Sequence, residues 1–174
     1  MSAIETVKIM NPNICQASFQ DFAHFQALIS KSARILQAQY YKQSEIETAL
    51  ELVCGIEELI ISGNFLVAKH EKRIIGCGGW AIDVSEPQKA ELRSFFVHPD
   101  FARKGVATQL FTACENECSH KGIEILYLTA TLSGEPFYQK CGFSEIERFK
   151  QNLSNGETFE LVKMVKVISG CQAY

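Results

Sequence analysis

The apolar positions of the chain follow a helical period most clearly around residue 46. They recur there at i, i+3, i+4, i+7 and i+8, which predicts an amphipathic helix with one buried face: Ile46, Ala49, Leu50, Val53 and Cys54. Ser44, followed three residues later by Glu47, has the form of a capping box at the start of this helix. The acidic positions of the same segment are typical of a solvated helix face.

Upstream of this helix the pattern is weaker. Alternation over residues 5–10 predicts a first strand, which ends where Pro12 stands between two asparagines. Ser18 or Asp21 then caps a helix whose apolar side carries Phe22, Phe25 and Ile29. Residues 34–41 continue either as a second short helix or as a loop.

Two apolar runs joined by a charged tip predict a hairpin in the middle of the chain. The runs are residues 65–70 and 74–82, and Glu71-Lys72-Arg73 forms the tip. The second run is interrupted by Gly76, Gly78 and Gly79. A glycine-rich strand interior usually marks a bulge or a close backbone neighbour. These glycines do not have the spacing of a dinucleotide-binding loop, so we do not expect one.

A strand–helix–strand unit follows a polar loop at residues 83–89. Residues 90–97 are apolar on both faces, which predicts a strand in the middle of a sheet. The helix over 105–120 ends at Gly122 and buries one stripe of apolar residues: Val106, Leu110, Phe111 and Cys114. A strand over 123–132 completes the unit, so the two strands run parallel with a right-handed crossover.

The last third of the chain predicts a short helix and a second hairpin. The helix covers residues 136–141 and stops at Gly142. Residues 143–150 and 158–168 form the hairpin around Asn155-Gly156. The order of elements along the chain predicts one α+β domain with a mixed sheet.

Composition narrows the function classes. The 174 residues suit one domain, and 47% hydrophobic with 21% charged residues is typical of a soluble globular protein. The formal net charge of −3 argues against a nucleic-acid partner. The N-terminus lacks the pattern of a signal peptide, and no apolar run approaches the roughly 18 residues of a membrane span. We therefore expect a cytoplasmic protein with no membrane partner.

The seven cysteines point to a reducing compartment rather than to disulfides. Their number is odd, and the sequence holds no C-x-x-C pair. Cys114, Cys118 and His120 lie close enough to suggest a metal site. Cys114 falls on the apolar stripe of its helix, however, and no second ligand cluster completes a tetrahedral site. We expect no metal.

Residues 95–108 carry the strongest local signal for a ligand. An apolar strand ends in a turn that places Arg103, Lys104 and Gly105 at the start of a helix. The first N–H groups of a helix lack partners within it, and the helix dipole favours an anion there. Gly105 lets the backbone approach a phosphate, and the small Ala107 keeps the next turn clear. The turn predicts a pyrophosphate site; the alternative is an ordinary junction with a solvated Arg-Lys pair.

Two motifs together give the sequence a family resemblance. Residues 102–107, Ala-Arg-Lys-Gly-Val-Ala, resemble the phosphate-binding motif Gln/Arg-x-x-Gly-x-Gly/Ala of the GNAT superfamily of acyl-CoA-dependent N-acyltransferases. Residues 137–143 match its second motif, an aromatic residue and Tyr138 followed by Gly142 and Phe143. Ala102 departs from the first motif. Thr131 stands where the family often has Asn, seven positions before the tyrosine.

The resemblance implies a fold and a coenzyme. The fold is a three-layer α+β domain over residues 1–174, with a mixed, largely antiparallel sheet of about seven strands splayed between strands 4 and 5. Acetyl-CoA would lie in the splay as acyl donor. Backbone groups of Phe95, Phe96 and Val97, and Thr131, would hold its pantetheine arm. Its diphosphate would lie on the turn residues Arg103, Lys104, Gly105, Val106, Ala107 and Thr108.

The resemblance also implies a reaction, in which the acetyl group passes directly to a primary amine. Glu91 has the spacing of a base carboxylate seen in some members, and its alternative is a structural ion pair with Arg93. Tyr138 would protonate the departing thiolate, and its alternative is a packing aromatic. The amine would enter near the early helices and the loop after Trp80. Members are often dimers, so a homodimer is one expectation.

Other functions stay open on the sequence alone. A non-catalytic acyl-CoA sensor of the same fold is the main alternative, since Ala102 and Thr131 depart from the motifs. An interaction domain that has lost the coenzyme is a third. The sequence lacks a Gly-x-Ser-x-Gly elbow and a P-loop, which argues against a serine hydrolase or a nucleoside triphosphatase. The acceptor stays open among aminoglycosides, polyamines, amino acids and protein amines.

Overall fold

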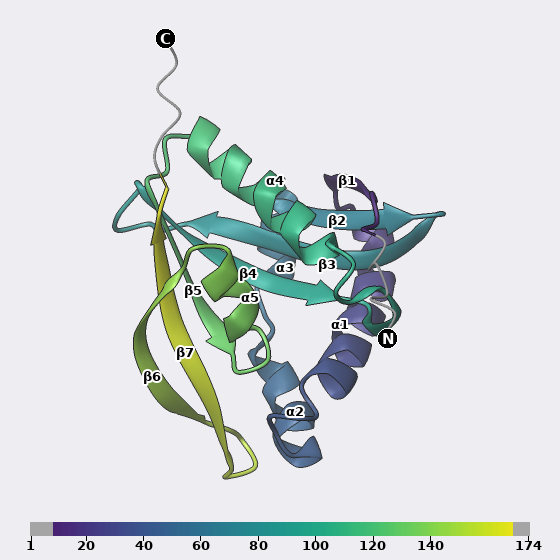
Figure 1. The fold of residues 1–174 in the computed structure, drawn as a ribbon, viewed down its shortest axis with the longest axis vertical. Helices are drawn as coiled ribbons and strands as arrows, with labels where there is room; N and C mark the ends of the chain where they lie inside the picture. Colours follow the sequence, from purple (N-terminus) through teal and green to yellow (C-terminus); the bar gives the residue numbers. More distant parts are fainter. Residues whose placement is uncertain (1–8, 169–174) are drawn as a thin grey trace, which may run out of the picture.

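The computed structural model describes residues 9–168, which form a seven-stranded sheet with helices on both faces (Figure 1). The strands, in chain order, are β1 (Asn13–Gln16), β2 (Phe65–His70), β3 (Arg73–Ile82), β4 (Lys89–Val97), β5 (Ile125–Thr131), β6 (Ser144–Asn152) and β7 (Thr158–Val167). Their spatial order is β1-β2-β3-β4-β5-β7-β6, and β4–β5 is the parallel pair among antiparallel ones. The predicted α+β class with a mixed, largely antiparallel sheet is confirmed.

The helices divide between the two faces. They are α1 (Phe22–Leu36), α2 (Gln43–Ala49), α3 (Ile56–Ile61), α4 (Val106–His120) and α5 (Glu135–Lys140), with 3-10 turns η1 (Phe19–Asp21), η2 (Leu50–Leu52) and η3 (Pro99–Phe101). Alternation along β2 sets the layers. Leu66 packs with the core under α4, whereas Phe65 and Val67 pack with α1 and α3 on the opposite face. Among these helices, none is long and apolar enough to cross a membrane.

The glycines of β3 mark close approaches, as the sequence predicted. A Cβ on Gly79 would lie 2.6 Å from the backbone oxygen of Asn64, and one on Gly78 would lie 2.8 Å from the Phe95 ring. Since real Cβ atoms do not come so close, both positions require glycine. The Phe95 ring therefore packs against the backbone of β3 at Gly78, and this contact fixes the position at which β4 changes direction.

A bulge in β4 precedes the point where the sheet opens. Arg93 pairs with Gly79 and Phe96 with Cys77, so Ser94 and Phe95 together face Gly78, and Ser94 has a positive φ of 56°. A bulge of one residue exchanges the faces of the strand beyond it. The parallel pairing of β4 with β5 covers only residues 89–91 and 125–127. The predicted splay between strands 4 and 5 is confirmed.

The N-terminal predictions need correction. Residues 5–8 lie outside the described residues, residues 9 and 10 are not in a strand, and the first described strand is Asn13–Gln16. The Asn-Pro-Asn segment therefore leads into a strand, of which Asn13 is the first residue. Proline lacks an N–H for the ladder, and the apolar Ile14 beyond it packs on the core beside β2.

The helix predicted from residue 46 onward is shorter than expected and starts earlier. The Glu45 carboxylate accepts the Lys42 N–H at 2.8 Å, so α2 starts at Gln43 and Ser44 is not its cap. The chain tightens into η2 after Ala49, and Gly55, with φ of +76°, then turns it into α3. We did not predict α3. Residues 34–36 extend α1, and residues 37–42 form a loop.

Candidate active site

The splay of β4 and β5 opens into a cleft of about 1140 Å³. It is bordered by the end of α1, the α1–α2 loop, η2, the first turn of α4, α5 and the β6–β7 hairpin. All but one of the residues that the sequence predicted for the site line it: Glu91, Phe95, Phe96, Val97, Arg103, Gly105, Val106, Ala107, Thr108, Thr131 and Tyr138. The fold thus brings residues from four separate elements to one cleft.

The first turn of α4 presents main-chain donors to the cleft. The first hydrogen bond of this helix runs from the Gln109 N–H to the Gly105 carbonyl at 3.1 Å. The N–H groups of Val106, Ala107 and Thr108 come before it, so they have no acceptor in the helix. Arg103 and Gly105 have positive φ values of 60° and 83°, which shape the turn. This arrangement suits an anion such as a phosphate.

Arg103 and Lys104 have different surroundings, although they are neighbours. Arg103 lines the cleft, whereas Lys104 does not. The Lys104 ammonium donates to the Asp100 carbonyl at 2.8 Å and lies 5.6 Å from the centre of the Phe101 ring. We therefore assign the side-chain charge at the helix start to Arg103.

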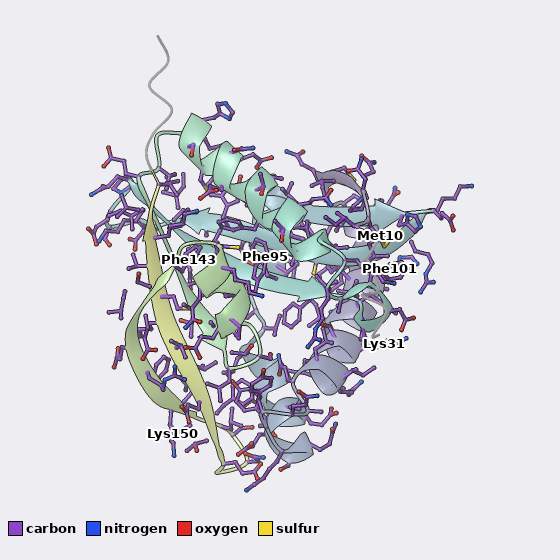
Figure 2. The ribbon with its side chains drawn as sticks, in the orientation of Figure 1. Met10, Lys31, Phe95, Phe101, Phe143 and Lys150 are labelled. Carbon is purple, nitrogen blue, oxygen red and sulfur yellow. The ribbon has the colours of Figure 1, made fainter. Side chains whose placement is uncertain are left out.

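The N-terminal segment supports the turn, a role that the sequence did not reveal. The Met10 N–H donates to the Lys104 carbonyl at 2.9 Å, and the Gln109 side chain donates to the Met10 carbonyl at 2.6 Å. Figure 2 shows Met10 and Phe101 beside the start of α4. Because Met10 and Gln109 lie 99 positions apart, no local pattern could have indicated this contact.

Main-chain groups of β4 face the open side of the splay. The His98 N–H donates to the Ile75 carbonyl at 2.8 Å, and hydrogen-bonded and non-bonded pairs alternate along an antiparallel ladder. Phe96, opposite Cys77, therefore directs its N–H and carbonyl to β3, and Val97 directs its own away from β3. In the described pairing β5 does not reach Val97, so these groups border the cleft.

Tyr138 lies in α5 within an aromatic cluster. Its ring centre is 6.4 Å from that of Phe95 and 5.7 Å from that of Phe143, both in edge-to-face geometry. Figure 2 shows Phe95 and Phe143 beside α5. Burial raises the pKa of Tyr138 well above that of a free phenol, so the hydroxyl stays protonated at neutral pH.

Glu91 and Thr131 line the cleft with their polar atoms engaged. The Arg93 Nε donates to the Glu91 carboxylate at 2.8 Å, which is the structural ion pair that the sequence offered as the alternative. The Thr131 hydroxyl accepts the Gly134 N–H at 3.2 Å and shares a hydrogen bond of 3.0 Å with Ser133. It therefore helps to build the turn between β5 and α5.

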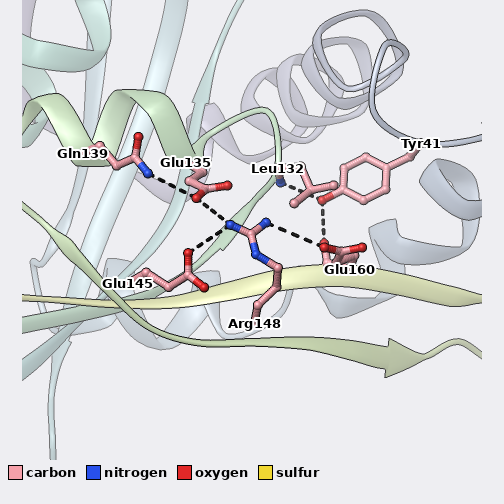
Figure 3. A network of polar contacts seen from close by, with 7 residues as sticks. All are labelled: Tyr41, Leu132, Glu135, Gln139, Glu145, Arg148 and Glu160. Atoms are coloured by element: carbon pink, nitrogen blue, oxygen red, sulfur yellow. Dashed lines mark hydrogen bonds and ion pairs between the residues drawn. The ribbon is translucent and has the colours of Figure 1, made fainter.

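Tyr41 holds the two sides of the cleft together, and sequence reasoning missed it. Its hydroxyl donates to the Glu160 carbonyl at 2.7 Å and accepts the Leu132 N–H at 2.7 Å (Figure 3). Its ring stacks on Phe159 with 4.0 Å between ring centres. Burial raises its pKa to about 12. Beside it, Arg148 pairs with Glu160 and two further glutamates (Figure 3).

Comparison with known proteins assigns the chain to a family. The model of the acetyltransferase (GNAT) family matches residues 31–143. The chain belongs to this family. The match includes the α4 turn and the Tyr138 motif, and the resemblance drawn from the sequence is confirmed. A GNAT-family member is an acetyltransferase in general terms, and the family assignment does not specify an acceptor.

Individual relatives agree with this assignment. The chain is 32% identical over 85 residues to an uncharacterized N-acetyltransferase of Chlorobaculum tepidum. That match covers 49% of this chain and 52% of the relative, so the chain spans about half the length of the curated relative it matches.

Two solved structures share the fold. The GCN5-related N-acetyltransferase from Rhodopseudomonas palustris has a TM-score of 0.78 at 23% identity, with 92% of this chain and 98% of that chain covered. The PaiA N-acetyltransferase from Thermoplasma acidophilum, solved in complex with coenzyme A, has a TM-score of 0.71 at 22% identity, with 91% and 100% covered.

Proposed function

We propose that the protein transfers an acetyl group from acetyl-CoA directly to a primary amine. The observation that carries the proposal is the convergence of free α4 amides, Val97 main-chain groups and the protonated Tyr138 phenol on one cleft. Membership of the acetyltransferase family supports it, as does the coenzyme A bound to the Thermoplasma relative.

The residues present fit the coenzyme. The N–H groups of Val106, Ala107 and Thr108, with the Arg103 guanidinium, would hold the diphosphate. The N–H and carbonyl of Val97 suit the amide groups of the pantetheine arm, much as a neighbouring strand would. The side chains of Phe95 and Phe96 form apolar walls for that arm.

The reaction removes two protons from the amine nitrogen and adds one proton to the sulfur. An amine with a pKa near 10 is mostly protonated at neutral pH and must lose a proton before it can attack. Glu91 accepts that proton, directly or through a water. The amine nitrogen then bonds to the thioester carbon, and the carbon–sulfur bond breaks as Tyr138 donates its proton to the sulfur. The second proton that the nitrogen gives up returns to the Tyr138 oxygen through water, which restores the phenol. The products are the N-acetyl amine and the free thiol of coenzyme A.

Direct transfer is favoured over an acyl intermediate on Cys141, Cys114 or Cys118. Cys141 is the cysteine nearest to Tyr138 in sequence, and burial raises the pKa of its thiol. A nucleophilic cysteine needs the opposite shift, because the thiolate is the reactive form. Cys114 and Cys118 are fully buried, and burial raises their pKa values as well.

The test is release of free thiol from acetyl-CoA by the purified chain with a panel of amines. Tyr138→Phe should lower kcat by about 100-fold or more, as expected for loss of a general acid, with acetyl-CoA affinity nearly unchanged. Tyr127→Phe removes a hydroxyl that is bonded to Asp83 outside the cleft, and it should retain activity. Unchanged turnover in Tyr138→Phe would refute the role of Tyr138.

A non-catalytic acyl-CoA sensor is the second candidate. The observation that favours it is that both Glu91 and Thr131 are engaged within the protein. Tight binding of acetyl-CoA without thiol release across the whole amine panel would support the sensor and contradict the transferase.

A further inference from the structure

One part of the cleft has a chemical character that bears on the acceptor. We define the acceptor arm as the part of the cleft between η2 and the β6–β7 hairpin, with Glu91 and Arg93 on its β4 wall. Its remaining wall comes from both sides. Leu50, Leu52, Val53 and Phe149 are apolar, Gln151 is polar, and Phe159 and Leu161 line the cleft although they are almost fully buried. Burial of an apolar group against such a wall contributes favourable binding free energy, whereas burial of a charged group there contributes none.

Negative charge is scarce in the cleft. Within residues 9–168, the charged side chains that line it are Glu91, Arg93, Arg103 and Lys140. The carboxylate of Glu91 is already paired with Arg93. An acceptor with a second ammonium group would therefore bring it into an apolar arm without a free carboxylate.

The acidic residues of the early helices do not supply this charge, because none of them lines the cleft. Glu47 forms a bidentate pair with Arg34, with distances of 2.6 and 2.8 Å. Glu51 accepts the Ser154 hydroxyl at 2.8 Å. The Glu45 carboxylate accepts the Lys42 N–H at the start of α2. The acidic early helices therefore place no carboxylate on the wall of the cleft.

The arm is also closed on the side of α2. Three ties join this region to the β6–β7 hairpin. Before the helix, the Tyr41 hydroxyl donates to the Glu160 carbonyl. At its start, the Ser44 hydroxyl donates to the Glu157 carboxylate at 2.9 Å. After the helix, the Glu51 carboxylate accepts the Ser154 hydroxyl. Buried apolar residues fill the space between these ties, Ile46 and Ala49 among them. An extended peptide needs an open groove or a free strand edge, and the ties close the route between α2 and the hairpin.

We propose, on the basis of the proposed function, that the acceptor is a small primary amine with an uncharged apolar body, alkyl or aryl. The amine nitrogen lies at Glu91, and the apolar body packs between η2 and the aromatic residues of the hairpin. Polyamines and aminoglycosides are poor acceptors because they carry additional positive charges. Peptide amino groups are poor acceptors because the arm has no room for an extended peptide chain.

The test compares hexylamine with hexane-1,6-diamine in the thiol-release assay. The two amines have the same length and a similar reacting group, so the comparison isolates the second ammonium. We expect kcat/KM for hexylamine to exceed that for the diamine at least about tenfold, since the arm cannot pair the second charge. We also expect kcat/KM for 2-phenylethylamine to exceed kcat/KM for a pentapeptide with an N-terminal phenylalanine by a similar factor.

A designed variant weakens the preference. Leu52 is 40% exposed and lines the arm, so Leu52→Glu adds a carboxylate without disturbing the core. This variant should narrow the ratio between hexylamine and the diamine at least about fivefold. Ile61 is 75% exposed in α3 and does not line the cleft, so Ile61→Glu adds the same charge elsewhere and should leave the ratio unchanged.

The outcomes separate this inference from the proposed function. Equal or better turnover of the diamine or the peptide would overturn the inference and leave the transferase intact. If no amine is acetylated, the binding affinities of hexylamine and hexane-1,6-diamine are measured by calorimetry in the presence of coenzyme A, and their ratio tests the inference. Tighter binding of hexylamine by at least about tenfold supports the arm as described, and any smaller preference overturns it.

Discussion

Replacement of Tyr41 by phenylalanine tests how the cleft is held together. The ring and its stacking on Phe159 stay, and only the hydroxyl is lost. That hydroxyl has two partners at 2.7 Å, the Leu132 N–H and the Glu160 carbonyl. A polar group left without its partner in a buried setting costs about 1–3 kcal/mol. Both partners here are half-buried, so we expect the variant to lose about 2–4 kcal/mol in total.

Thermal and urea unfolding would measure this loss. For a chain of this length 1 kcal/mol corresponds to roughly 2–4 °C, so the Tm of Tyr41→Phe should fall by about 4–16 °C. The urea m-value should not change, since the folded state keeps its compactness. Tyr40 is 46% exposed, and Tyr40→Phe, its matched control, should shift Tm by less than about 1 °C. Equal shifts in the two variants would refute the account of Tyr41.

Two further predictions concern charges. Arg103→Ala should weaken acetyl-CoA binding by about tenfold or more, while Lys104→Ala should weaken it less than about twofold, because only Arg103 of the two lines the cleft. Equal losses of affinity in calorimetry would contradict the assignment of the side-chain charge to Arg103. Hydrogen bonds from Ser85 and Tyr127 lower the pKa of Asp83 to about 2. Its ionised form thus stabilises the fold above the unfolded pKa of about 4, and this contribution is lost as the pH falls through 2. The difference in urea midpoint between wild type and Asp83→Asn should be largest above pH 5 and vanish towards pH 2, and a difference that grows on acidification would refute this.

Much of the fold could be predicted because its signals are local. The apolar runs of β2, β3 and β4, the stripe of α4 and the Asn155-Gly156 turn each lie within one short segment. The α4 turn was predictable for the same reason, since the free N–H groups of a helix start and the positive φ of Gly105 depend on neighbouring residues alone. The parallel pairing of β4 and β5 followed from the crossover between them.

The remainder depended on contacts between distant residues. Glu47 had the capping spacing, but Arg34, 13 positions upstream, pairs with it, and Glu45 accepts the N–H at the helix start. The two hydrogen bonds of Tyr41 span 91 and 119 positions, so residues 37–42 offered no sign of their role. The direction of Lys104, by contrast, depends on the nearby η3 turn, which packs its ammonium over Phe101.

Calorimetric titration of acetyl-CoA into the wild type and two glycine variants tests the central claim most directly. Gly105 and Gly122 lie at opposite ends of α4 with similar φ values, 83° and 76°, so glutamate brings similar backbone strain at each. Gly105→Glu adds a carboxylate at the proposed phosphate site and should weaken binding at least about 100-fold, while Gly122→Glu should bind like the wild type. Absence of heat from wild type at millimolar acetyl-CoA, or equal affinity of Gly105→Glu and wild type, would contradict the account.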